Sequence, residues 1–183
     1  VVLTERSAKL KNHTGEVSFP GGRMEQGESL MQTALREANE EIGIDRQKVN
    51  MIGRLDDAWS GAAYHLAALV GWYDDIPNFT ANTDEVGKIL IPDIDELYDE
   101  NNRKERIVER HGLVFKSTSI KYQDSLIFGL TADLLCEALE QGLGTNTERG
   151  SRRAENLQNA LNSQFFAYQK SNGNRPPQSD LVK

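Results

Sequence analysis

Cysteine and histidine are scarce in this chain of 183 residues. Cys136 is the only cysteine, which excludes an intrachain disulfide and any zinc site built on several thiolates. The three histidines, His13, His65 and His111, stand far apart and show no spacing typical of metal ligands. Zinc centres built on thiolates are therefore excluded, and no histidine metal site is indicated.

Positive charge is also in short supply. Lysine and arginine number 21 against 28 aspartates and glutamates, which gives a net charge of −7. Non-specific nucleic-acid binding needs a basic surface, so we expect no nucleic-acid partner. A nucleotide substrate is still compatible with this charge, because a divalent metal held by carboxylates reverses the local field.

Long apolar segments are missing as well. The longest mostly apolar run covers residues 61–73 and is too short to span a bilayer as a helix. No basic start followed by an apolar stretch indicates a signal peptide. We therefore expect a cytoplasmic protein with no membrane partner. The chain begins without methionine, inside the apolar Val1-Val2-Leu3, so we also expect that a segment precedes it in the natural protein.

The hydrophobic pattern predicts an irregular succession of strands and helices, and hence an α/β fold rather than repeated βαβ units. Strands are expected at residues 1–4, 16–19, 49–54, 64–73 (nearly continuous and therefore central), 85–91 and 113–115. Helices are expected at residues 30–42, between an N-cap at Ser29 and a stop at Gly43, at 93–98 and at 125–141. The strongly charged residues 101–111 indicate a solvated helix or a loop.

We expect one domain over residues 1–143, followed over residues 144–183 by a C-terminal helix and a polar tail. The helix is predicted at residues 153–169. The polar, proline-bearing residues 171–183 are expected to be mobile.

The chemistry is concentrated on the helix predicted at residues 30–42. At about 100° per residue, Glu37, Glu40 and Glu41 point toward one region. Such like charges repel each other, so a positive ion is expected among them. Mg²⁺ prefers oxygen ligands and commonly combines one or two carboxylates with substrate phosphates. Arg36 and Glu28 are placed to pair and to orient the cluster.

An acidic helix face taken alone is usually surface decoration, but here a longer pattern surrounds it. The chain matches Gly-x5-Glu-x7-Arg-Glu-U-x-Glu-Glu-x-Gly-U, where U is aliphatic, at Gly22, Glu28, Arg36, Glu37, Ala38, Glu40, Glu41, Gly43 and Ile44. Chance occurrence is on the order of 10⁻⁹ per start position, so the match is not accidental. This pattern is the Nudix box, and the chain resembles the Nudix hydrolases.

The resemblance implies a Nudix fold: an α/β structure with a mixed β-sheet between helices and the box as loop–helix–loop. It also implies Mg²⁺- or Mn²⁺-dependent hydrolysis of a nucleoside diphosphate linked to another moiety. Glu37, Glu40 and Glu41 would be metal ligands, with a backbone carbonyl near Gly22 as a further ligand. Glu40, Glu41 and Glu85, the last from outside the box, are the candidate catalytic residues, and the identity of the general base stays open.

The segment before the box resembles one subfamily of the Nudix hydrolases in particular. Residues 3–22 read LTERSAKLKNHTGEVSFPGG and are similar to the signature of the coenzyme A diphosphatase subfamily. Lys11 and Glu16 depart from that signature, which usually has Arg and Gln there. The resemblance implies cleavage of coenzyme A to 3′,5′-ADP and 4′-phosphopantetheine. The basic residues Arg6, Lys11 and His13 are the candidate substrate-binding residues.

Two alternatives remain beside the coenzyme A hypothesis. The substrate could be another nucleoside diphosphate derivative, such as ADP-ribose or NADH, or the domain could sense nucleotides without turnover. The intact box disfavours the second. The aromatic residues Trp59, Tyr64 and Trp72 could stack on adenine, but aromatics around a strand are more often part of the core. The partner is in either case a small nucleotide, and the chain is a monomer or a homodimer.

Overall fold

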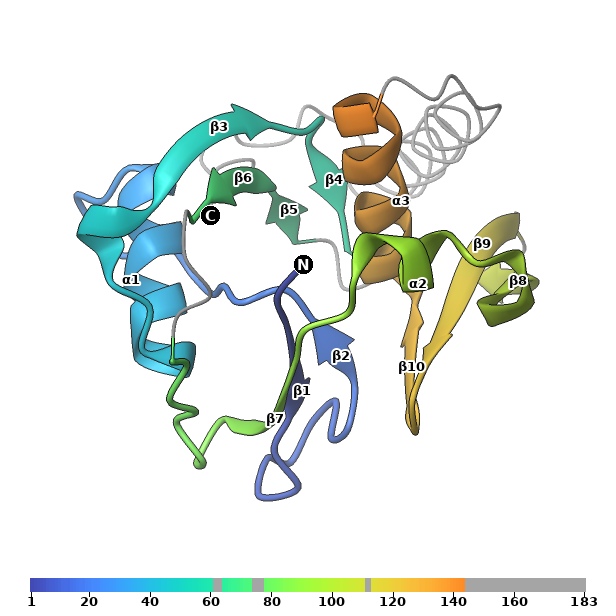
Figure 1. Cartoon of the computed structure of the whole chain (residues 1–183), viewed down its shortest axis with the longest axis horizontal. Helices are drawn as coiled ribbons and strands as arrows, with labels where there is room; N and C mark the ends of the chain where they lie inside the picture. The colour runs from blue at the N-terminus through green and yellow to red at the C-terminus, as the bar shows by residue number, and fades with distance from the viewer. Residues whose placement is uncertain (61–63, 74–77, 111–112, 144–183) are drawn as a thin grey trace, which may run out of the picture.

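The computed structural model describes residues 1–60, 64–73, 78–110 and 113–143 (Figure 1). The helix predicted at residues 153–169 and the polar tail lie outside the described residues. Helices and sheets alternate irregularly, as expected, and the α/β class is confirmed. The strands are β1 (Leu3–Arg6), β2 (Val17–Ser18), β3 (Asn50–Arg54), β4 (Ala58–Trp59), β5 (His65–Leu66), β6 (Leu69–Trp72), β7 (Val86–Leu90), β8 (Arg103–Arg110), β9 (Leu113–Tyr122) and β10 (Ser125–Phe128).

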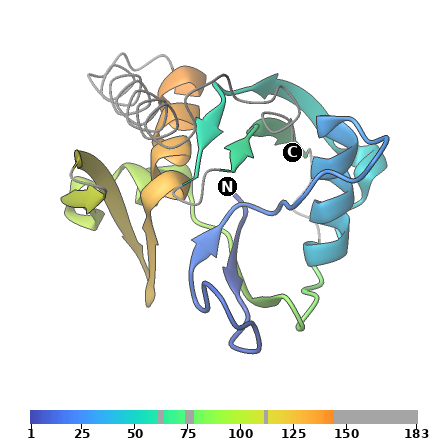
Figure 2. The same cartoon turned by 180° about the vertical axis from the view of Figure 1, so that it is seen from behind.

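The helices are α1 (Leu30–Ile42), α2 (Ile94–Tyr98) and α3 (Gly129–Leu143), with short 3-10 turns η1 (Arg46–Lys48) and η2 (Glu100–Asn102). In both views, α1 and α3 stand on opposite sides of the strands β1, β2 and β7 (Figures 1 and 2). Within the described ranges, no helix is long and apolar enough to cross a bilayer.

Strand β1 lies between β2 and β7 in an antiparallel sheet. Leu3 opposes Leu90 across this sheet, and both are buried. The register shifts between Glu5 and Arg6, which is where β1 leaves regular pairing with β7. This sheet therefore carries Arg6 at the end of one strand and brings Glu85 to the start of its neighbour.

A second antiparallel sheet has the order β10-β9-β8, and α3 packs against it. The inward side chains of both sheets and of α3 form one core. Its buried members are Leu3, Val17, Leu90, Leu97, Ile120, Ile127, Ala132, Leu135, Cys136 and Leu139.

The helix predicted at residues 125–141 starts too early. Residues 125–128 form β10 instead, and α3 begins at Gly129, whose φ of +62° marks the change of direction. Buried Ser125 and Ile127 alternate with exposed Leu126, which is strand periodicity. Pairing of Ile127 with Ile120 on β9 decides the outcome, because the short apolar run fits either structure.

The prediction of a helix or a loop at residues 101–111 is wrong for residues 103–110, which form a strand. Arg103–Arg110 is the edge strand β8, paired along its whole length with β9, which itself continues to Tyr122. Its charged side chains are tolerated because an edge strand presents them to water. The long central strand expected at residues 64–73 is instead the two short strands β5 and β6, and Trp72 is 57% exposed. Among the described residues, β5 pairs with β4 and β6 pairs with β3, each in a two-stranded sheet.

Helix α1 has the predicted ends. The Ser29 hydroxyl accepts from the Gln32 amide while the Gln32 side chain accepts from the Ser29 amide, and Gly43 takes the left-handed conformation with φ of +71°. Its predicted apolar face is covered toward the C-terminal end: Ile42 is buried and Leu35 half-buried, whereas Leu30 and Met31 in the first turn are exposed. Thr33 and Glu41 are also buried, so one carboxylate of α1 points inward.

Truncating two neighbouring side chains of β10 to alanine tests whether residues 125–128 form a strand. Ile127→Ala should lower the free energy of unfolding by about 2–5 kcal/mol because Ile127 is fully buried. Leu126→Ala should lower it by less than about 1 kcal/mol, since Leu126 is 44% exposed. Urea unfolding followed by circular dichroism measures both. Similar losses for the two variants would contradict the alternating burial described here.

Candidate active site

The guanidinium of Arg36 holds the loop before α1 against the helix. Its Nε donates to Glu28 at 2.7 Å, its Nη1 to Glu37 at 2.9 Å and to Glu40 at 3.0 Å, and its Nη2 to the Arg23 carbonyl at 3.0 Å. The predicted pairing of Arg36 with Glu28 is thus confirmed. The hydrogen bonds from Arg36, from the Glu25 amide and from Thr33 lower the pKa of Glu28 to about 2. Glu28 therefore stays ionised.

The Gly21-Gly22 turn lies directly against the carboxylates. A Cβ added to Gly22 would come within 2.3 Å of the Glu37 carboxyl carbon, so any larger residue there would have to push the Glu37 carboxylate aside. The Gly21 amide donates to Glu41 Oε2 at 3.3 Å. The turn that ends β2 therefore sets how closely the loop backbone approaches Glu37 and Glu41.

Glu41 is the buried member of the cluster, with 7% of its surface exposed. Burial raises its pKa to about 7, and repulsion from Glu37 and Glu85 acts in the same direction. The Gly21 hydrogen bond and the charge of Arg6 oppose this shift. Glu37, Glu41, Glu85 and Arg6 consequently share one electrostatic environment, although they come from α1, β7 and β1.

These residues fit a divalent cation. Glu37 and Glu41 supply hard oxygen ligands beside the loop backbone, and their negative charge near Glu85 is only partly compensated. Within the described ranges, no three acidic or histidine side chains are already gathered as a complete metal site. A partial protein site is what Mg²⁺ usually has, since it keeps water molecules and binds substrate phosphates as further ligands.

The other predicted residues are placed differently. Glu40 is half-exposed and bound to Arg36. Arg6 has its Nε buried without a hydrogen-bond partner among the described residues. Lys11 and His13 lie on the loop that joins β1 to β2, whereas Gly21 follows the other end of β2, and His13 pairs with Glu16 at 3.0 Å. The structure thus brings Arg6 and Glu85 to the cluster but not Lys11 or His13.

No role was predicted for Arg23, and Tyr64 was predicted either to stack on adenine or, more commonly for such aromatics, to belong to the core. Arg23 Nη2 donates to the Tyr64 hydroxyl at 2.8 Å, and Tyr64 is half-exposed. Next to Tyr64, His65 is hydrogen-bonded to Asp57 at 2.7 Å and its ring packs on Trp59. The position of Arg23 directly after Gly22 is the signal that could have drawn attention to it.

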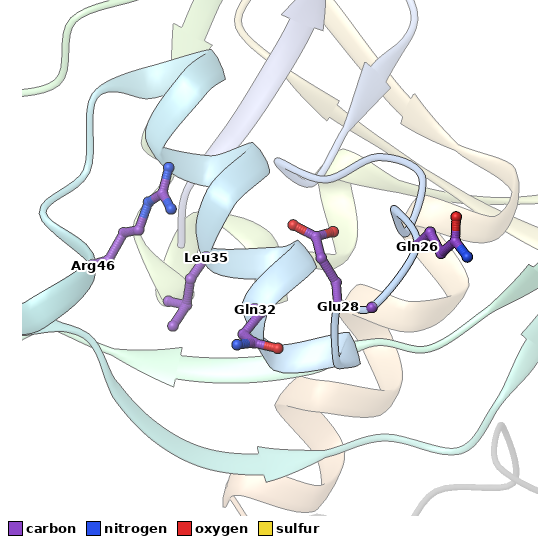
Figure 3. A pocket seen from close by; sticks show the side chains of 6 residues that line it. Gln26, Glu28, Gln32, Leu35 and Arg46 are labelled. Atoms are coloured by element: carbon purple, nitrogen blue, oxygen red, sulfur yellow. The ribbon is translucent and has the colours of Figure 1, made fainter.

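A hollow of about 360 Å³ lies along α1, lined by Gln26, Gly27, Glu28, Gln32, Leu35 and Arg46. Figure 3 shows side chains from the loop before α1, from the helix itself and, with Arg46, from η1. Glu37 and Glu41 do not line it. The hollow is therefore separate from the space in front of the clustered carboxylates.

Comparison with known proteins decides the family. The model of the NUDIX domain matches residues 1–111. The chain belongs to the Nudix family. It is accordingly a Nudix hydrolase acting on a nucleoside diphosphate derivative, with the Nudix fold, and this family uses divalent metal ions.

Two relatives, one bacterial and one from a nematode, support this assignment. The chain is 35% identical over 142 residues to an uncharacterized Nudix hydrolase NudL of Photorhabdus laumondii, covering 77% of this chain and 76% of that protein. It is 39% identical over 127 residues to Nudix hydrolase 3 of Caenorhabditis elegans, covering 67% of this chain and 49% of that protein. A MutT/nudix family protein from Enterococcus faecalis of solved structure aligns with a TM-score of 0.39 and 18% identity, over 70% of this chain and 43% of that one.

Substitution of Gly22 tests the close approach at this Nudix site. Gly22→Ala should weaken Mn²⁺ binding by about tenfold, because the new methyl group displaces the Glu37 carboxylate. Gly53→Ala on β3 is the matched control, since a Cβ there meets nothing within 4 Å. Electron paramagnetic resonance of free Mn²⁺ measures both affinities. Equal affinities of Gly22→Ala and the wild type would show that Glu37 is not positioned through Gly22.

Glu41 makes the metal-free protein sensitive to pH. Its folded-state pKa of about 7 lies above its ordinary value of 4.5, so the folded state binds the proton more tightly. The corresponding stability is present at low pH and is lost as the pH rises from 4.5 to about 7. Glu41→Gln should therefore raise the unfolding temperature at pH 8 with a chelator present. The rise should be roughly 2–4 °C for each kcal/mol by which the substitution increases the free energy of unfolding.

Glu40→Gln is the control, because Glu40 is half-exposed and paired with Arg36, and its unfolding temperature should not rise. Differential scanning calorimetry at pH 5 and pH 8 makes the comparison. An unfolding temperature of Glu41→Gln at or below that of the wild type at pH 8 would rule out the repulsion described here.

Proposed function

We propose that this Nudix hydrolase cleaves the diphosphate bond of coenzyme A and its derivatives, giving 3′,5′-ADP and 4′-phosphopantetheine. The proposal is supported by the similarity of residues 3–22 to the coenzyme A diphosphatase signature, and by the position of Arg6 within it. Arg6 Nε is buried without a partner among the described residues, and its charge acts on Glu41. A phosphate oxygen of the substrate would satisfy this donor.

The roles of the residues follow from their surroundings. Glu37 and Glu41 would hold the cation, which we propose is Mg²⁺ or Mn²⁺. When bound, the cation neutralises the diphosphate and lowers the pKa of a coordinated water. Arg36 orients Glu37 through the 2.9 Å hydrogen bond and takes up the charge of Glu40. Arg6 binds a diphosphate oxygen from the sheet side.

Glu85 is the carboxylate that we assign as proton acceptor for the attacking water. It stands across from Glu41 at the start of β7, and its backbone is held by hydrogen bonds to Ser7 and Asn82. Glu40 is less suited to this role because its carboxylate is already engaged by Arg36, whose Nη1 donates to it at 3.0 Å. We place the reaction in the cytoplasm, with the chain as a monomer or a homodimer.

Product analysis tests the substrate. The purified protein is incubated with coenzyme A, dephospho-coenzyme A, ADP-ribose and NADH, with Mg²⁺ and with Mn²⁺, and the products are separated chromatographically. We expect metal-dependent formation of 3′,5′-ADP from coenzyme A, faster than cleavage of the other three. Glu41→Gln should reduce this turnover by several orders of magnitude because it removes a metal ligand.

The outcomes separate the alternatives. Release of AMP from ADP-ribose or NADH without cleavage of coenzyme A would show that coenzyme A is not the substrate. Hydrolysis of a diphosphate bond would still be the reaction. Binding of these nucleotides without turnover of any of them would overturn the enzymatic role in favour of a nucleotide-sensing module.

A further inference from the structure

Arg23 and Tyr64 form a pair that the reaction described above does not use. The Arg23 guanidinium carbon lies 5.1 Å from the centre of the Tyr64 ring, and Nη2 donates to the hydroxyl at 2.8 Å. The two residues come from different segments: Arg23 follows the Gly21-Gly22 turn, and Tyr64 precedes β5. Their contact therefore joins the loop between β2 and α1 to the β4–β5 pair of strands.

The Tyr64 ring is both held and exposed. Its backbone amide donates to the Ser60 hydroxyl at 3.0 Å, and its carbonyl accepts from the Ser60 amide at 2.9 Å. Its hydroxyl is fixed by Arg23, so the side chain is anchored at both ends while 50% of the residue stays exposed. An aromatic ring held in this way loses little conformational freedom when a planar group stacks on it.

The pair is tied to the clustered carboxylates by a short chain of contacts. The Arg23 carbonyl accepts from Arg36 Nη2 at 3.0 Å, and Arg36 Nη1 donates to Glu37 at 2.9 Å. Gly22, the residue before Arg23, packs against the Glu37 carboxylate itself. Tyr64 is thus connected to Glu37 through three hydrogen bonds in sequence: from Arg23 to Tyr64, from Arg36 to the Arg23 carbonyl, and from Arg36 to Glu37.

We propose that Tyr64 binds the base of the substrate by stacking, and that Arg23 is a positioning residue that holds the ring through its hydroxyl. This inference rests on the function stated above only as far as the substrate is a nucleoside diphosphate derivative. Trp72, another strongly exposed aromatic residue, lies at the end of β6, which pairs with β3 in a different sheet from β4 and β5 beside Tyr64.

Two non-hydrolysable ligands separate base binding from diphosphate binding. α,β-Methylene-ADP and methylenediphosphonate share the bridging group, and only the first carries adenosine. Both are titrated calorimetrically in the presence of Mg²⁺ into the wild type, Tyr64→Ala, Tyr64→Phe, Arg23→Ala and Trp72→Ala. Tyr64→Ala should weaken α,β-methylene-ADP by about fivefold or more, the effect of losing one stacked base. Methylenediphosphonate should bind Tyr64→Ala as it binds the wild type.

The remaining variants test the role of Arg23. Tyr64→Phe keeps the ring and should lose only part of the affinity for α,β-methylene-ADP. Adding Arg23→Ala to Tyr64→Phe should cause little further loss if Arg23 acts through the hydroxyl, whereas additive losses would contradict its positioning role. Trp72→Ala should bind both ligands as the wild type does.

The titrations distinguish failure of this inference from failure of the proposed function. Equal weakening of both ligands in Tyr64→Ala, or selective loss of α,β-methylene-ADP in Trp72→Ala instead, would overturn the stacking role while leaving the hydrolase intact. If the wild type bound neither ligand and cleaved none of the four nucleotides in the product analysis, both proposals would fail.

Discussion

The guanidinium of Arg36 is the interaction on which the site depends. One positive charge serves Glu28, Glu37 and Glu40 and also fixes the Arg23 carbonyl, so a single side chain joins the loop to α1. Because its donors have a rigid planar geometry, the positions of these oxygens are fixed relative to one another, which a lysine could not achieve. Glu41 is left outside this network, with the Gly21 amide as its donor. The uncompensated negative charge is thereby concentrated at one buried point.

This arrangement departs from the usual amphipathic helix in one respect. Most surface helices bury an apolar stripe, whereas α1 buries the polar Thr33 and Glu41 together with Ile42 and leaves Met31 exposed. Its attachment depends on hydrogen bonds at its ends, including those from the Thr80 and Asn82 amides to the Ile42 and Glu41 carbonyls. Stability is sacrificed here for the local charge, as is common where a site must bind a cation.

How far the sequence predicts this structure depends on the range of the interactions. The ends of α1 were predicted because Ser29 and Gly43 act within one turn, and the Glu28–Arg36 pair because the box specifies it. Strand β8 could not be predicted, since its charged residues acquire strand structure only through pairing with β9. The approach of Arg6 to Glu41 likewise depends on β1 pairing with β7, which brings together residues 80 or more positions apart.

The capping of α1 also determines which end of the helix can bind an anion and which end can bind a cation. The first turn of an α-helix commonly binds phosphate, because its free amides and the positive end of the helix dipole attract anions. In α1 the Gln32 amide donates to the Ser29 hydroxyl, and the Ser29 amide donates to the Gln32 side chain. The Ser29 hydroxyl also donates to the Gln32 side chain. Glu41 instead lies at the negative end of the dipole. The helix is therefore polarised to attract a cation rather than an anion, and under the function proposed above guanidinium groups and the metal would recognise the anionic substrate.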